Sequence, residues 1–320
     1  MSATTAPAAL GEIPDVAELP NPPSRDTKPA LLMTAPAVVG LVLFVLIPFL
    51  VAIYLSTHHL RLNSGHAANW MGLEQYRRIL LDAQFRGDFY RALLNNFTFA
   101  VIVVPLQTTL ALGLALLLNR PLRGMAVFRT FFFMPVVFPM ALVAVVWKLI
   151  YSRDDIGLLN AFVDKVSFGA LGPIDWLGDS KSALLSIVLM SIWQGVGFQM
   201  IILLAGLQGI PTSLYEAAAI DKANTWKQFT NITVPSLKNT LIFVSLVTTI
   251  FSFRLFDQVY IMTKGGPDNA TTTVMYQAVT TAFDADNVGR GAAMTVVFFI
   301  IVVVITLIQR SVLREEREVA

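Results

Sequence analysis

Six long apolar stretches place the strongest limit on how this 320-residue chain folds. They cover residues 29–56, 96–119, 128–151, 183–207, 240–260 and 291–308. A helix that crosses the hydrocarbon core of a bilayer needs roughly 20 apolar residues. Because lipid offers the backbone no hydrogen-bond partner, stretches of this length are predicted to be helices and not the short alternating strands of a barrel. The sequence therefore predicts an all-α membrane protein with six transmembrane helices in contact with a lipid bilayer, and kinks at their internal prolines: Pro36, Pro48, Pro105, Pro135 and Pro139.

The overall composition supports a membrane protein and excludes several other classes. Hydrophobic residues make up 55% of the chain and charged residues only 14%, whereas about a quarter of a soluble domain is charged. A net charge of +2 is too small to indicate a nucleic-acid partner. The chain has no cysteine, so disulfides and thiolate chemistry are excluded. Its three histidines lack matched carboxylates nearby, which argues against a metal site.

The segments outside the apolar stretches suggest three regions. Residues 1–29 hold six prolines and no apolar core, so we expect a disordered N-terminal tail with no cleavable signal. Residues 30–310 form the predicted transmembrane domain, and residues 311–320 a short C-terminal tail. With the N-terminus inside, the inner segments carry eleven Lys and Arg and the outer loops ten. That charge bias is too small to fix the orientation.

The loop between the fourth and fifth stretches, residues 211–235, is the most informative segment. Ser213 and Glu216 have the spacing of a capping box, in which a serine oxygen caps the helix and the glutamate reaches back. A short helix, a polar break near Asn224 and a second half-helix before Pro235 follow from the pattern. From the residues alone, the loop could be a well-capped surface helix or a docking surface, and both interpretations remain possible.

At these positions the sequence resembles the EAA loop of permeases from binding-protein-dependent ABC importers. The matching residues are Glu216, Ala217, Ala218, Asp221, Ala223, Phe229, Ile232 and Pro235. Further matches, from Met134-Pro135 to Gly265-Gly266-Pro267, are similar to the carbohydrate-uptake branch with its maltose-type and glycerol-phosphate-type permeases. The resemblance as a whole covers nearly all of the chain, from about residue 30 to residue 310. One residue departs from the pattern, because Lys222 stands where the family has glycine. We expect lysine to resist a left-handed turn there.

The resemblance implies the permease fold of a type I ABC importer and a set of partners. The 211–235 loop would insert a coupling helix into a cytoplasmic ATPase, with Glu216 facing a basic group. The partners would be a second homologous permease, two ATP-binding cassette ATPases and an extracytoplasmic solute-binding protein. The chain has no G-x-x-x-x-G-K-[ST] sequence, so ATP and Mg would be bound by the partner ATPase and no cofactor by this chain. The loop and both termini would then lie on the cytoplasmic side of a bacterial cytoplasmic membrane.

Polar residues inside the apolar stretches are candidates for the solute pathway. Arg254 and Asp257 lie three residues apart, so on one helix they would share a face and pair. Such a pair could line the solute pathway, or the two charges could simply neutralise each other in a structural role. Gln107, Trp193 and Gln194 could offer hydrogen bonds and an aromatic surface to a sugar, although Trp193 serves equally well in packing.

Three classes of function remain to be compared. A membrane-embedded enzyme would need grouped acids, bases or nucleophiles, and no such group is evident, so the chain is not predicted to be an enzyme. A secondary transporter or channel that works without an ATPase is the alternative, but it favours internal repeats, and none is found. The EAA-like loop favours the first class. We therefore predict a transmembrane permease subunit of an ATP-driven importer that forms half of the pathway for a sugar or related polyol.

Overall fold

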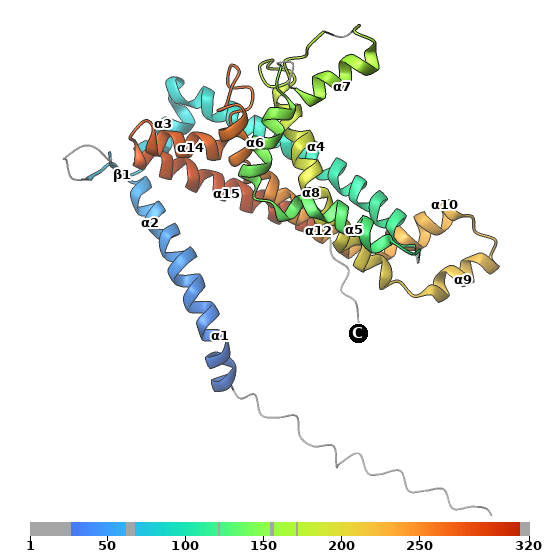
Figure 1. The fold of residues 1–320 in the computed structure, drawn as a ribbon. Coiled ribbons are helices and arrows are strands. Elements are labelled where there is room, and N and C mark those ends of the chain that lie inside the picture. The colour runs from blue at the N-terminus through green and yellow to red at the C-terminus, as the bar shows by residue number, and fades with distance from the viewer. Residues whose placement is uncertain (1–26, 62–67, 121, 154–156, 171, 314–320) are drawn as a thin grey trace, which may run out of the picture. The chain divides into compact units, whose positions relative to one another are not determined.

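The computed structural model describes residues 27–61, 68–120, 122–153, 157–170 and 172–313, with the side chains of residues 27–29 left out (Figure 1). The predicted N-terminal tail lies outside the described residues, except that residues 27–29 already belong to the first helix. Of the predicted C-terminal tail, residues 311–313 continue the last helix and the rest lies outside. The chain divides after Val51 into two compact units, which are described separately.

The first unit is a single helical run. Helix α1 spans Thr27–Leu41, the π-helical segment η2 spans Val42–Leu46, and α2, spanning Ile47–Ser56, continues the run into the second unit. Pro48 has no N–H to donate to the preceding turn, and the widened π turn ends at Leu46, two residues before it. Residues 30–56 form the first candidate membrane span, in which an 18-residue window has a mean hydropathy of 3.0.

The second unit holds a small antiparallel hairpin and a bundle of helices. Its elements are β1 (His58–His59), β2 (Asn69–Trp70), α3 (Glu74–Leu81), α4 (Ala83–Leu118), α5 (Met125–Phe133), η3 (Met134–Val137), α6 (Met140–Ile150), α7 (Leu158–Ser167), α8 (Ala183–Gln208), α9 (Thr212–Ile220), α10 (Thr225–Gln228), η4 (Phe229–Thr233), α11 (Val234–Ser236), α12 (Lys238–Phe253), α13 (Asp257–Met262), α14 (Val274–Phe283) and α15 (Val288–Leu313). The hairpin pairs His58 with Trp70.

Five helices in the described part of the chain are long and apolar enough to cross a membrane, and a bent pair brings the number to six. The bent pair is the third predicted span. It was expected as one kinked helix, but Met125–Val137 and Met140–Ile150 meet at 99°. Proline restricts the residue before it to extended backbone, and Phe138, directly before Pro139, has a ψ of 138°. The kink predicted from the prolines is therefore a full break.

The bundle core lies between α4 and α8. Ala111 and Ala115 of α4 are completely buried in one cluster with Met200 and Leu203 of α8, because small side chains on α4 leave room for large ones on α8. Helix α5 approaches α8 still more closely. A Cβ added to Gly197 would overlap the backbone carbonyl of Phe132, so only glycine fits there.

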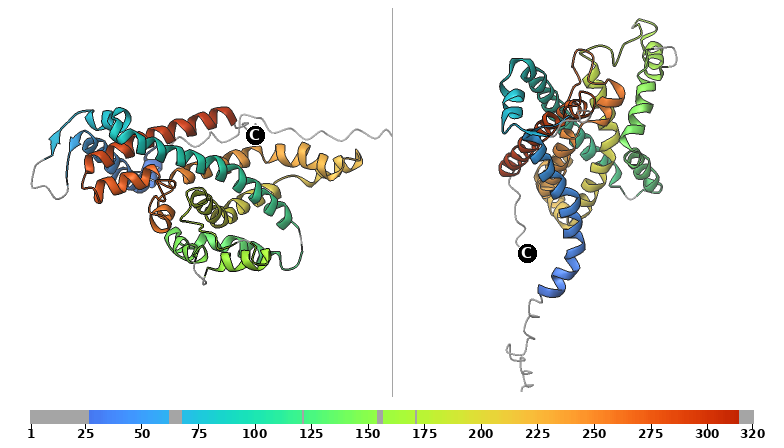
Figure 2. Two further views of the ribbon diagram at one scale, coloured as in Figure 1. Left: turned by 90° about the horizontal axis from the view of Figure 1, so that it is seen from above. Right: turned by 90° about the vertical axis from the view of Figure 1, so that its left-hand side faces the viewer.

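The two ends of the bundle differ. The α9–α10 segment projects from one end, which we call the loop end (Figures 1 and 2). The hairpin, α3, α14 and the beginning of α15 gather at the opposite end, which we call the far end.

Candidate functional site

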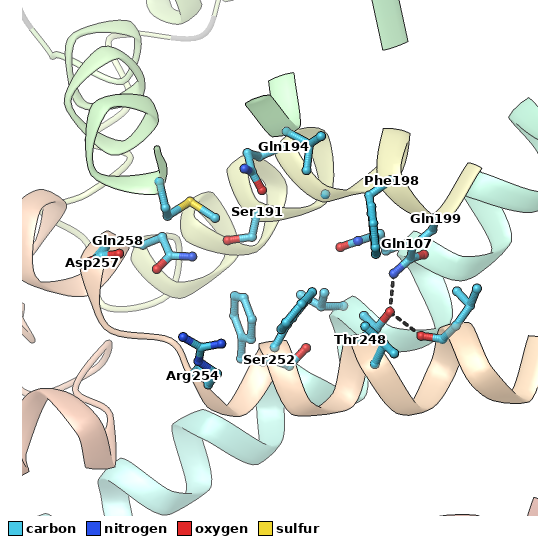
Figure 3. A pocket seen from close by; sticks show the side chains of 18 of the residues that line it. Gln107, Ser191, Gln194, Phe198, Gln199, Thr248, Ser252, Arg254, Asp257 and Gln258 are labelled. Carbon is cyan, nitrogen blue, oxygen red and sulfur yellow. Dashed lines mark hydrogen bonds between the residues drawn. The ribbon is translucent and has the colours of Figure 1, made fainter. Parts of the chain in front are cut away.

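A cavity of about 430 Å³ opens among α4, α6, α8, α12 and α13 (Figure 3). Pockets that take small molecules in proteins have volumes of about 300–1,000 Å³. Apolar side chains such as Phe99, Val103 and Phe198 form much of the wall. The polar lining residues are Gln107, Ser191, Gln194, Gln199, Thr248, Ser252, Arg254, Asp257 and Gln258.

Several of these polar groups are buried without a partner. Gln199 donates from Nε2 to Thr248 Oγ1, which in turn donates to the carbonyl of Val244 over 2.7 Å. Three polar atoms have no hydrogen bond to any described residue: Gln199 Oε1, Ser191 Oγ and Ser252 Oγ. The three residues are buried, with only 3–8% of their surface exposed. A buried polar group left unpaired costs about 1–3 kcal/mol. Three such groups around one cavity are suited to binding a ligand with hydroxyl groups.

Gln107 reaches the cavity because α8 offers no side chain opposite it. A Cβ on Gly195 would lie 2.6 Å from Gln107 Nε2, so the glycine leaves space for the amide. Gln107 is 6% exposed. Figure 3 shows it at the end of the cavity near Gln199 and Thr248.

The predicted pairing of Arg254 with Asp257 is wrong. Helix α12 ends at Phe253 and α13 begins at Asp257, so the two residues do not share a helix face. The buried Leu255 occupies the break, and its carbonyl accepts from Thr273 Oγ1 over 2.8 Å. None of the ion pairs formed among the described residues joins Arg254 to Asp257. Both side chains are exposed and line the cavity at the end opposite Gln107 (Figure 3).

Of the two remaining candidates for the solute pathway, one lines the cavity and the other does not. Gln194 lines the cavity, whereas Trp193 does not and packs on Trp147 with ring centroids 5.5 Å apart. Four of the five predicted pathway residues therefore meet in one cavity. Sequence reasoning missed five further polar lining residues: Ser191, Gln199, Thr248, Ser252 and Gln258. Their spacing could have indicated them, because residues 191 and 199, and 248 and 252, fall on one helix face within apolar stretches.

The 211–235 loop forms two short helices at the loop end. The capping box is wrong, because Pro211 and not Ser213 occupies the N-cap of α9 and no side chain caps that end. Proline sets its own φ without a partner, and the Leu214 amide donates to the Pro211 carbonyl over 3.2 Å. Glu216 is exposed, and its carboxylate makes no hydrogen bond or ion pair with any described residue.

Lys222 adopts the conformation that we expected it to resist. Its φ is +56°, in the left-handed region, and for a residue other than glycine this costs roughly 1–2 kcal/mol. The turn is held by two bonds, from the Lys222 amide to the Ala219 carbonyl at 3.0 Å and from the Ala223 amide to the Ala218 carbonyl at 2.9 Å. The turn geometry is therefore kept without glycine.

The second half of the loop is fixed to the first. Asn224 Oδ1 accepts from the Lys227 amide over 2.9 Å and caps α10. The hydroxyls of Tyr215 and Thr233 lie 2.9 Å apart and join the two halves.

The other motif residues are spread over the loop. Ala217 lies in α9, Asp221 ends it, and Phe229 begins η4, where it packs on Trp226. Pro235 lies in α11. Ile220 and Trp226 are 82% and 68% exposed, which gives the loop an apolar, solvent-exposed outer surface.

Comparisons with known proteins agree with this architecture. Residues 79–317 match the family described as binding-protein-dependent transport system inner membrane component. The trehalose/maltose transport system permease protein MalF of Thermococcus litoralis is 33% identical over 294 residues, which are 92% of this chain and 96% of the relative. The lactose transport system permease protein LacF of Rhizobium radiobacter is 34% identical over 291 residues, 89% of this chain and 94% of the relative.

A solved structure shows the same fold. A chain of the bacterial alginate ABC transporter, in complex with its alginate pentasaccharide-bound periplasmic protein, superposes with a TM-score of 0.75. That likeness covers 89% of this chain and 93% of the other at 18% identity. The chain therefore has the type I importer permease fold, and it belongs to the family of inner membrane components of binding-protein-dependent transport systems. It is a multi-pass membrane protein and a permease subunit of an ABC importer, which decides against the secondary transporter or channel.

Proposed function

We propose that this permease forms one half of the translocation pathway for a neutral carbohydrate or polyol, and that the cavity among α4, α8 and α12 receives the solute. The three unpaired polar groups of Ser191, Gln199 and Ser252 carry the proposal. Sugar hydroxyls both donate and accept hydrogen bonds, so they can satisfy all three. The relatives named for trehalose/maltose and for lactose support the solute class.

The partners follow from the family and from the exposed loop. A second homologous permease would complete the pathway, an extracytoplasmic solute-binding protein would deliver the solute, and two ATPases would bind ATP and Mg. The apolar outer surface at Ile220 and Trp226, beside the exposed Glu216, is suited to an ATPase groove. This arrangement requires the loop and both termini on the cytoplasmic side of the cytoplasmic membrane.

Serine substitutions in the cavity test the solute site. In proteoliposomes that contain the four-subunit complex and its binding protein, uptake of radiolabelled trehalose, maltose and lactose is measured for Ser191→Ala and Ser252→Ala. A hydrogen bond is worth about 0.5–1.5 kcal/mol, so we expect the half-saturating solute concentration to rise roughly threefold to tenfold. Thr109→Ala is the matched control, because it removes a hydroxyl from α4 outside the cavity. Wild-type uptake in both serine variants would overturn the assignment.

Glu216→Gln tests the coupling role. Since Glu216 does not cap α9, glutamine should leave assembly and thermal stability unchanged. Loss of a charge-assisted contact of about 1.5–3 kcal/mol to an ATPase should lower both uptake and binding-protein-stimulated ATP hydrolysis about tenfold or more. Ser213→Ala, on the same helix, is the control. Unchanged uptake in Glu216→Gln would show that its charge does not couple the subunits.

A further inference from the structure

Three arginines from three separate segments meet at the far end of the bundle. Arg61 follows the hairpin strand β1, Arg78 lies in α3 and Arg290 lies in the first turn of α15. Among the charged groups that act on the Arg290 guanidinium, Arg78 and Arg61 are like charges. The segment after β1 and the start of α15 are joined directly, because the Val288 amide donates to the Leu60 carbonyl over 3.1 Å. We call Arg61, Arg78 and Arg290 the arginine cluster.

Two acidic side chains act on Arg78 and Arg290, and each of them also has another partner. Glu74 is shared, with 3.5 Å to Arg77 and 3.2 Å to Arg78. Asp82 is the nearby opposite charge for Arg290, but one of its carboxylate oxygens already accepts from the Gln84 amide. Arg78 and Arg290 therefore share Glu74 and Asp82 with other donors, and neither carboxylate is reserved for them.

Arg290 is held in place and keeps a donor unused. Its Cζ lies 3.9 Å from the ring centroid of Phe85, a cation–π contact that fixes the plane of the guanidinium. Its Nε is buried and has no hydrogen-bond partner among the residues that the structure describes. A fixed guanidinium with a free donor is suited to an anion that accepts several hydrogen bonds.

Exposed apolar side chains flank the cluster. Trp70, Leu73 and Leu81 are 74%, 74% and 69% exposed, and they lie just before α3, at its N-cap and at its end. Arg290 lies near the beginning of the candidate membrane span of α15, in which an 18-residue window has a mean hydropathy of 2.9. Tryptophan and arginine beside apolar side chains at the end of a span are typical of the membrane interface.

We propose that the arginine cluster binds the phosphate of an anionic phospholipid, with Trp70, Leu73 and Leu81 inserted at the boundary of headgroups and acyl chains. Arginine presents a planar set of donors that matches phosphate oxygens. A headgroup bound there joins β1, α3 and α15 from outside and fixes the far end in the membrane. The flanking apolar side chains favour a lipid over an acidic protein surface, which would need polar surroundings.

Lipid retention by the purified four-subunit complex tests the proposal. The complex is incubated in detergent with dioleoylphosphatidylglycerol or dioleoylphosphatidylcholine, and the retained lipid is counted by native mass spectrometry. We expect the wild type to retain phosphatidylglycerol preferentially, and the Arg78→Gln, Arg290→Gln variant to lose affinity for it about tenfold, equal to 1.4 kcal/mol. The Lys165→Gln, Lys181→Gln variant removes the same charge from exposed sites outside the cluster and should behave as wild type.

Four results would overturn the proposal. Equal losses in the two double variants would indicate diffuse charge attraction, and equal retention of the two lipids by the wild type would exclude headgroup recognition. Loss of affinity for the solute-binding protein with phosphatidylglycerol still retained would assign the cluster to protein docking. If the glutamine variant does not assemble, Arg290→Lys keeps the charge without the planar donors. Retention at the wild-type level in Arg290→Lys would equally contradict a phosphate held by the guanidinium.

Discussion

Two glycines in α8 differ in what an added methyl group would meet, and the difference can be measured. A Cβ on Gly197 would overlap the Phe132 carbonyl and come within 2.9 Å of the Phe133 Cα, so it meets only the backbone of α5. A Cβ on Gly195 would meet the amide end of Gln107, which can rotate away. We therefore expect Gly197→Ala to disturb the fold and Gly195→Ala to disturb the cavity.

The magnitudes follow from packing and helix propensity. Overpacking a rigid contact costs about 1–3 kcal/mol, and the backbone on both sides at Gly197 places it near the upper value. Alanine returns up to about 1 kcal/mol through its higher helix propensity, which leaves a net loss of about 2 kcal/mol for Gly197→Ala. At roughly 2–4 °C per kcal/mol, the apparent Tm should fall about 4–8 °C. For Gly195→Ala the propensity gain remains, so the apparent Tm should stay level or rise by about 2 °C.

The assay compares both variants in one preparation of the purified complex. Intrinsic fluorescence gives the apparent Tm, and uptake of labelled maltose into proteoliposomes gives transport. We expect Gly195→Ala to raise the half-saturating solute concentration at full assembly, because Gln107 is displaced from the cavity. An unchanged apparent Tm in Gly197→Ala would refute the close approach of α5 and α8, and unchanged transport in Gly195→Ala would show that the position of Gln107 is not used.

Three further predictions test single features of the structure. Because Arg254 and Asp257 do not pair, the effects of their alanine substitutions on uptake should add in the double variant, and a coupling above about 0.5 kcal/mol would contradict this. Asn160 makes four hydrogen bonds that join Ser152, Ile174 and Trp176, so Asn160→Ala should cost about 1–3 kcal/mol and speed proteolysis within residues 152–182. A cysteine at Lys227, in this cysteine-free chain, should react with an impermeant maleimide only in inside-out vesicles, and labelling of intact spheroplasts would place the loop outside.

The sequence was sufficient for the number and place of the spans because hydropathy acts over about 20 residues and averages out local detail. It was insufficient where a single local contact decides. Proline alone is compatible with either a kink or the 99° break that the chain makes at Phe138. The predicted N-cap of α9 was wrong because Pro211 and Ser213 both favour a helix start, and only the backbone conformation distinguishes them.

The candidate site was found in part because polar residues in apolar stretches are rare and conspicuous. Gln107, Gln194, Arg254 and Asp257 stood out in this way and line one cavity. Serine and threonine did not stand out, since in a helix their hydroxyls can bond to a carbonyl of the preceding turn. Thr248 does so, but Ser252 does not, and that difference appears only in coordinates.

The breaks at Phe138 and after Phe253 both border the same cavity, and this explains why its lining combines charged and neutral polar groups. Met140, just after the first break, lines the cavity beside Val136, and Arg254 and Asp257 line it at the second break. A continuous helix through residues 240–260 would have put Arg254 and Asp257 on one face, where they would have neutralised each other. Because α12 ends at Phe253, the two charges do not form an ion pair and remain available at one end of the cavity, while the other polar lining groups are neutral amides and hydroxyls. The interruption of the span therefore supplies the charged groups that any solute reaching that end must meet.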